Sequence, residues 1–115
     1  MNHRSLRMES LIQEKLSQII LREIDIPVGT LATISYVRVS SDLLNGEVGV
    51  SIIPGDKIKE VMELLKKEQG SLQHLLNYSL NLKPMPRIEF VYDPGLEKAA
   101  KIEKLLEVEN GEESI

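Results

Sequence analysis

The chain has 115 residues, no cysteine and a net charge of −4 at pH 7. A chain of this length buries roughly two-thirds of its unfolded surface, which is enough for one domain with a single core. Without cysteine there is neither a disulfide framework nor a thiolate metal site, and the polar start MNHRSLRMES is not a signal peptide. We therefore expect a soluble, cytoplasmic protein with no membrane segment.

The charge is distributed unevenly along the chain. Arg4 and Arg7 precede the first acid, Glu9, and form either a small basic arm or ordinary surface charge. The last nine residues hold four acids and no base, so the remainder of the chain is close to neutral. Residues 107–115 are therefore predicted to be a flexible acidic tail. Its acids are Glu107, Glu109, Glu112 and Glu113.

An amphipathic helix is predicted over about residues 5–24, because apolar residues recur there every three or four positions. These residues are Met8, Leu11, Ile12, Leu16, Ile19 and Ile20. The polar side of the helix has charges of both signs and no aromatic anchor, so we expect it to pack on the protein's own sheet rather than on a membrane.

Two strands forming a hairpin are predicted next, over residues 30–40 and 44–53, with a turn at Ser40, Ser41 and Asp42. Both segments are rich in β-branched residues, and the second alternates between apolar and polar positions. The expected core residues of the hairpin are Ile34, Val37, Val39, Val48, Val50 and Ile52.

A pair of helices follows Pro54 and Gly55. Asp56 is expected to cap the first helix and Ser71 the second, while Gly70 ends the first helix in a left-handed conformation and Pro84 stops the second. The apolar positions of the first helix are Ile58, Val61, Met62, Leu64 and Leu65, and the buried stripe of the second comprises Leu72, Leu75, Leu76, Ser79 and Leu80.

The glycine between these helices has two interpretations. It is a simple connector of the kind found in helix hairpins, or it leaves room for a phosphate to approach the free N–H groups of the second helix. Lys66 and Lys67 favour the second interpretation, whereas Glu68 opposes it.

A third strand is predicted over residues 87–92, with Ile88, Phe90 and Tyr92 on one side. A turn at residues 93–95 leads to a last, C-terminal helix. The order α-β-β-α-α-β indicates an α+β fold with one three-stranded sheet packed on helices. We expect one domain over residues 1–106.

This order and several sequence strings resemble the ribosome-binding factor A family over residues 4–106. The strings are Arg7-Met8, Val39-Ser40-Ser41-Asp42-Leu43, Val48-Gly49-Val50-Ser51, Gly70 before the helix of residues 72–82, and Pro86-Arg87-Ile88-Glu89-Phe90-Val91-Tyr92-Asp93. The resemblance implies a K-homology domain of the second type. It also implies a non-catalytic ribosome biogenesis factor that binds immature small ribosomal subunits and assists late maturation and rRNA processing, particularly in the cold.

The resemblance further implies contacts with 16S rRNA near the 5′-terminal helix and the decoding region, a monomer off the ribosome, and no cofactor, metal or small-molecule substrate. The family's alanine-x-glycine kink corresponds here to Glu68, Gln69 and Gly70, so the alanine is absent. Gln73, Tyr78 and Asn81 stand where the family often has basic residues. Three missing phosphate contacts would flatten the salt dependence of RNA binding by roughly two to three units, so weaker and less salt-sensitive binding is expected.

The predicted RNA-binding residues are basic side chains together with backbone N–H groups at the start of the second helix of the pair. They are Arg4, Arg7, Lys66, Lys67, Gly70, Ser71, Lys83 and Arg87.

An enzyme is not predicted, because His3 and His74 have no cysteine or clustered carboxylates with which to form a catalytic or metal site. The alternative is a protein-interaction module with no direct role in RNA binding. Phe90 and Tyr92 are expected to be buried, which argues against base stacking and leaves phosphate and shape recognition of structured RNA.

Overall fold

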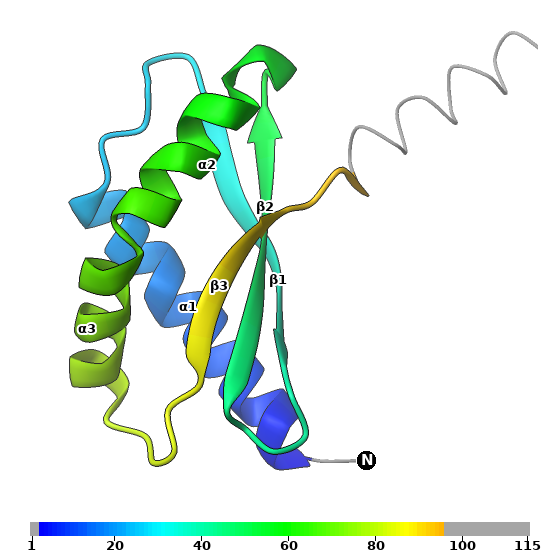
Figure 1. Ribbon diagram of the computed structural model, residues 1–115, viewed down its shortest axis with the longest axis vertical. Helices are drawn as coiled ribbons and strands as arrows, with labels where there is room; N and C mark the ends of the chain where they lie inside the picture. The colour runs from blue at the N-terminus through cyan, green and yellow to red at the C-terminus, as the bar shows by residue number, and fades with distance from the viewer. Residues whose placement is uncertain (1–2, 96–115) are drawn as a thin grey trace, which may run out of the picture.

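A computed structural model describes residues 3–95, in which three helices cover a three-stranded sheet (Figure 1). The predicted order α-β-β-α-α-β is confirmed. The C-terminal helix and the acidic tail expected from the sequence lie outside the described residues, and the K-homology assignment and the division at residue 106 stay predictions. The elements are α1 (His3–Glu23), β1 (Leu31–Val39), β2 (Asn45–Ile53), the 3-10 turn η1 (Gly55–Lys57), α2 (Ile58–Lys67), α3 (Gln69–Leu80) and β3 (Arg87–Tyr92).

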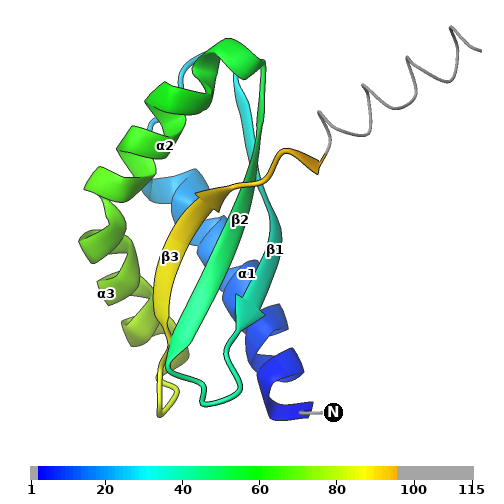
Figure 2. The same cartoon turned by 45° about the vertical axis from the view of Figure 1, so that its right-hand side comes forward.

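The strands lie in the order β1-β2-β3. The predicted hairpin is confirmed, since β1 pairs antiparallel with β2 from Leu31 opposite Ile53 to Val39 opposite Gly46. β3 pairs parallel with β2, and Arg87 lies opposite Asn45. A parallel pair needs a crossover between its strands, and α2 with α3 provides it, so these helices follow one another beside β3 in both views (Figures 1 and 2).

The core lies between one face of the sheet and the three helices. Alternation along the strands places Val48, Val50 and Phe90 on this face, where they are almost fully buried. The helices contribute apolar side chains at 0–1% exposure, which are Ile12, Leu16, Ile19, Val61, Leu65, Leu72 and Leu76. The expected core positions of the hairpin are all buried, but Leu11 and Ser79, expected on buried stripes, are exposed.

Polar side chains of the helices satisfy backbone groups of both edge strands. At the β1 edge, Glu9 Oε2 accepts a hydrogen bond from Val39 N at 2.7 Å, and Gln13 Nε2 donates to Ile34 O at 3.2 Å. At the β3 edge, α3 does the same through two glutamines described below. An edge strand otherwise presents unpaired N–H and C=O groups. These side chains give some of those groups a hydrogen-bond partner on β1 and on the β3 side of the sheet.

The helix ends differ from the sequence prediction. Asp56 lies within η1 and does not cap α2, which begins at Ile58 without a side-chain cap. The helix pair breaks at Glu68, whose φ and ψ are −91° and 5°, rather than at Gly70. Gly70 therefore lies in the first turn of α3, and the next residue, Ser71, is helical and is not the cap.

The C-terminal end of α3 also differs from the sequence prediction. Asn81 adopts a left-handed conformation with φ 49°, and its N–H donates to Asn77 O at 2.9 Å. Asparagine tolerates this conformation better than most residues, so it ends the helix three residues before Pro84. Pro84 was expected to stop the helix and does not set its boundary.

Candidate nucleic-acid interface

A groove runs along β3 where the chain passes from α2 to α3. It consists of two adjoining hollows of about 760 and 350 Å³, and Lys66, Gln69 and Arg87 line both. The larger hollow is completed by Asn45, Gly46, Glu47 and Glu89, and the smaller by Gly70 and Gln73. We call the two hollows together the β3 groove.

Three elements position the groove residues. Lys66 lies in the last turn of α2, Gln69 and Gly70 begin α3, and Arg87 begins β3. The Arg87 N–H donates to Leu44 O at 2.9 Å, which fixes the start of the strand beside β2. The fold therefore brings together two cations that are 21 positions apart in the sequence.

Gly70 leaves its side of the groove open. A Cβ added at this residue would meet no heavy atom within 4 Å, so packing within the chain does not require glycine here. The first N–H groups of an α-helix have no partner within that helix, and a glycine among them leaves the backbone accessible. This geometry fits the approach of a phosphate to the start of α3, although the left-handed stop expected at Gly70 is absent.

Two glutamines of α3 hold the outer edge of β3. Gln69 Nε2 donates to Ile88 O at 3.0 Å. Gln73 makes two bonds to this edge, since its Nε2 donates to Pro86 O at 3.1 Å and its Oε1 accepts from Ile88 N at 2.8 Å. Gln73 thus bonds as a neighbouring strand would, and it holds the backbone on both sides of Arg87. In the sequence Gln73 stands out only as a position where the family often has a basic residue, and no local pattern predicts its bonds to β3.

The other predicted site residues lie outside the groove. Lys67 and Ser71 are exposed beside groove residues without lining it, and Lys83 is exposed in the connection from α3 to β3. Arg4 and Arg7 are exposed in the first turns of α1. In both views α1 begins near the marked N-terminus, away from the α2–α3 junction (Figures 1 and 2). The structure therefore gathers Lys66, Gly70 and Arg87, and not the complete predicted set.

The segment around the groove has a charge unlike that of the whole chain. Residues 66–88 contain Lys66, Lys67, Lys83 and Arg87 against Glu68 alone, a net charge of +3 in a protein of net charge −4. Among the described residues, no carboxylate forms an ion pair with any of these four cations. The acid-free run from residue 69 to residue 88 was visible in the sequence, but the sequence analysis overlooked it.

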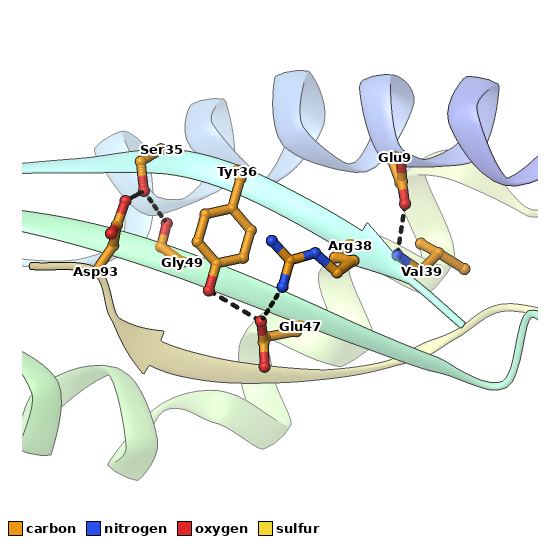
Figure 3. Close-up of polar contacts among 8 residues, drawn as sticks. All are labelled: Glu9, Ser35, Tyr36, Arg38, Val39, Glu47, Gly49 and Asp93. Atoms are coloured by element: carbon orange, nitrogen blue, oxygen red, sulfur yellow. Dashed lines mark hydrogen bonds and ion pairs between the residues drawn. The ribbon is translucent and has the colours of Figure 1, made fainter. Parts of the chain in front are cut away.

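The two acids that line the groove are Glu47 and Glu89. Glu47 Oε2 accepts a hydrogen bond from Tyr36 OH at 2.9 Å and pairs with Arg38 Nη1 at 3.3 Å (Figure 3). The Arg38 guanidinium also lies 4.8 Å from the centre of the Tyr36 ring. Arg38 therefore partly neutralises Glu47, which leaves Glu89 as the acid that opposes an anion in the groove.

The same cluster lies on the face of the sheet opposite the core. The Tyr36 ring covers Gly49, where an added Cβ would overlap ring atoms. Burial raises the pKa of the Tyr36 phenol, and the hydrogen bond to Glu47 raises it further. The Ser35 hydroxyl lies 2.6 Å from Asp93 Oδ2, which ties the end of β3 to β1 (Figure 3). No group of three or more potential metal ligands occurs within residues 3–95.

The tyrosines and the phenylalanine differ greatly in exposure. Phe90 is 1% exposed, as the strand pattern predicted, whereas Tyr92, which was also expected to be buried, is only half-buried. Tyr78, by contrast, is 84% exposed on α3. Base stacking was not expected because Phe90 and Tyr92 were predicted to be buried, but the exposed ring of Tyr78 is open to it.

A family model described as Ribosome-binding factor A matches residues 4–106. The chain belongs to the ribosome-binding factor A family. Ribosome-binding factor A of Coxiella burnetii (strain Dugway 5J108-111) is 33% identical over 107 residues, which cover 93% of this chain and 90% of the relative. The resemblance inferred from the sequence strings is confirmed.

Solved structures of ribosome-binding factor A share the fold. The crystal structure from Thermus thermophilus has a TM-score of 0.68 at 21% identity, over 78% of this chain and 97% of that one. A homology model of the Thermus thermophilus protein, fitted into a cryo-EM map of a 30S complex with ribosome-binding factor A, has a TM-score of 0.65 at 22% identity and covers 76% and 93%. The mixed α+β architecture is therefore that of the family. No helix within residues 3–95 is long and apolar enough to cross a membrane.

Proposed function

We propose that this protein binds the small ribosomal subunit and assists its late maturation without catalysing a reaction. Membership in the ribosome-binding factor A family supports this proposal, as does the fitting of the Thermus thermophilus relative into a map of a 30S complex. In this proposal the protein acts in the cytoplasm as a monomer, without a cofactor. Its target is 16S rRNA near the 5′-terminal helix, and the outcome is completed rRNA processing, with the greatest need at low temperature.

The observation that carries the proposal is the β3 groove. Lys66 and Arg87 face one hollow, the open backbone at Gly70 adjoins them, and the surrounding residues 66–88 have a net charge of +3. A phosphate in the smaller hollow, which has no acid in its lining, would meet two cations and the N-terminal end of α3. Neutralising a phosphate releases counterions, so binding through this groove weakens as salt rises.

A second candidate function rests on a different surface. Large apolar side chains are exposed at Leu21, Val28, Leu31 and Ile53, and Leu31 pairs with Ile53 across the sheet. Leu21 and Leu31 also line an apolar hollow of about 200 Å³ between α1 and β1. Exposed apolar patches often mark protein contacts. This surface favours a protein-interaction module, which would not require RNA.

The test is co-sedimentation of the full chain with small and large ribosomal subunits across a series of salt concentrations. We expect migration with small subunits, weakened by salt. The Lys66→Ala/Arg87→Ala variant should lower the salt slope by about 1.5 units, since each phosphate contact contributes about 0.7 to 0.9. The matched control is Arg22→Ala/Lys59→Ala, which removes two exposed cations outside the groove and should leave the slope unchanged.

The outcomes separate the two candidates. Equal slopes for the groove variant and the control variant would show that the groove does not contact RNA phosphates. A complex that persists after nuclease digestion of the RNA would favour the protein-interaction module. No migration with small subunits at low salt would overturn the proposed function.

A further inference from the structure

We propose that Tyr78 is a stacking platform for an unpaired RNA base, placed on α3 about two helical turns beyond Gly70 of the β3 groove. This inference rests on the proposed function, since it assigns a site for the single-stranded part of the RNA partner. Tyr78 is 84% exposed, while the same helix buries Leu72 and Leu76 completely on its other side. The ring therefore contributes little to the core and remains available to a partner.

The position of Tyr78 relative to the groove suits one continuous ligand. Gly70 and Tyr78 are eight residues apart in α3, which corresponds to about 12 Å along the helix. Exposed residues on the intervening and following turns are His74, Asn77 and Asn81. The Asn77 Oδ1 accepts a hydrogen bond from Gln73 Nε2 at 2.8 Å, so the turn that carries Tyr78 is linked to the glutamine that holds β3. A strand of RNA could span from the groove to the ring within a few nucleotides.

Charge favours RNA over other partners of this surface. No acid occurs from residue 69 to residue 88. A phosphate that approaches α3 or its connection to β3 is therefore not repelled by a carboxylate within these residues. Lys66 and Arg87 lie at one end of this surface, and Lys83 lies just beyond the C-terminal end of α3. Cations that contact the backbone, combined with an exposed aromatic side chain on which a base can stack, are the arrangement that binds single-stranded nucleic acid.

The chemistry also specifies which part of an RNA is recognised. Bases in an A-form duplex are stacked on one another, so their faces are closed to a protein side chain, whereas bases in loops, bulges and ends are open. Tyr36 cannot serve in the same way, because its ring covers Gly49 and contacts Arg38. Tyr78 thus adds a preference for unpaired RNA to the phosphate contacts of the β3 groove.

The test measures binding of the full chain to a labelled single-stranded RNA decamer and to a duplex of the same sequence, by fluorescence anisotropy. We expect tighter binding to the single strand. Tyr78→Ala should weaken that binding roughly 5- to 150-fold, which is the range for one base–aromatic stack, and should leave the salt slope unchanged. Tyr78→Phe keeps the ring and should keep the affinity, and Ser79→Ala, an exposed neighbour, is the matched control.

A second readout uses the absence of tryptophan from the chain. Tyrosine then dominates the emission, and the decamer should quench it in the wild-type protein and much less in Tyr78→Ala. The stacking inference is overturned if Tyr78→Ala binds the decamer as tightly as the wild-type protein does, or if Tyr78→Phe loses as much affinity as Tyr78→Ala. Either result combined with normal, salt-sensitive migration on small subunits would leave the proposed function standing. Loss of subunit binding by the wild-type protein itself would instead count against the proposed function.

Discussion

Replacing Gln73 with alanine should destabilise the protein by releasing the outer edge of β3. The Gln73 side chain accepts a hydrogen bond from Ile88 N at 2.8 Å and donates one to Pro86 O at 3.1 Å. In the alanine variant both backbone groups lose their partner. Arg87 lies between them, so the same change loosens the residue that contributes a cation to the groove.

The size of the effect follows from the burial of these groups. A buried donor without a partner costs about 1 to 3 kcal/mol. Because the contact is only partly buried, water can replace part of the loss, and we expect Gln73→Ala to lower the free energy of unfolding by about 2 kcal/mol. For a domain of this size that corresponds to a drop in melting temperature of roughly 8 °C.

A second substitution separates the two hydrogen bonds. Gln73→Glu retains an acceptor for Ile88 N, but its second carboxylate oxygen cannot donate to Pro86 O or to Asn77 Oδ1 and is repelled by both, so it should destabilise by at least about 2 kcal/mol. Urea denaturation of both variants, followed by circular dichroism, gives the values directly. His74→Ala, an exposed neighbour on the same helix, is the control and should change stability by less than about 0.5 kcal/mol.

The reasoning is refuted if Gln73→Ala is as stable as His74→Ala. It is also refuted if Gln73→Glu is as stable as the wild-type protein, because the carboxylate cannot donate to Pro86 O or Asn77 Oδ1. A drop in stability with an unchanged salt slope of subunit binding would show that the Gln73 hydrogen bonds stabilise β3 without positioning Arg87.

Three further predictions concern the sheet and its loops. Gly49→Ala should lower the free energy of unfolding by about 1 to 3 kcal/mol in thermal melts, because the added Cβ overlaps the Tyr36 ring, and an equally stable variant would contradict this packing. The pKa of Tyr36 is raised above 10.0, mainly by burial and then by its bond to Glu47, so its stabilising effect is complete below pH 10 and is lost as pH rises through the folded-state pKa. Absorbance titration near 295 nm should show a late-ionising phenol that Tyr36→Phe removes, and persistence of that phenol in the variant would refute the assignment. Hydrogen bonds, first from the Ser40 hydroxyl and then from Leu44 N, lower the pKa of Asp42 below 3.8, so its stabilising effect is present above that pH and is lost as pH falls through the folded-state pKa. The urea midpoints of wild type and Asp42→Ala should therefore differ at pH 7 and converge in acid, and a gap that stays constant across this range would contradict the linkage.

Sequence periodicity was sufficient to predict the described α-helices and strands, but not the 3-10 turn η1. The apolar spacing of α1, except at Leu11, and the alternation in β2 and β3 were correct, because each depends on which side of a single element faces the core. The exact helix ends were less predictable. Asp56 and Gly70 have the residue types of a cap and a stop, but the break at Glu68 depends on how α2 and α3 pack on the sheet, and propensity is weaker than packing.

The candidate site was only partly predictable. Lys66, Gly70 and Arg87 were selected from the sequence and do share the β3 groove, while Arg4 and Arg7 lie near the N-terminal end of α1. Basic residue type gives the ability to bind a phosphate, but it does not give the position of one cation relative to another. That position depends on the parallel pairing of β3 with β2.

The sequence by itself determined the class of fold, the order of the elements and, through its strings, the family. Only the tertiary structure decided that Gln73 holds the β3 edge, that Arg87 lies beside Lys66, and that Tyr78 faces solvent. The physical reason is that periodicity records the side of each element that must be buried. It does not record which neighbour a polar or aromatic side chain meets once the elements are packed together.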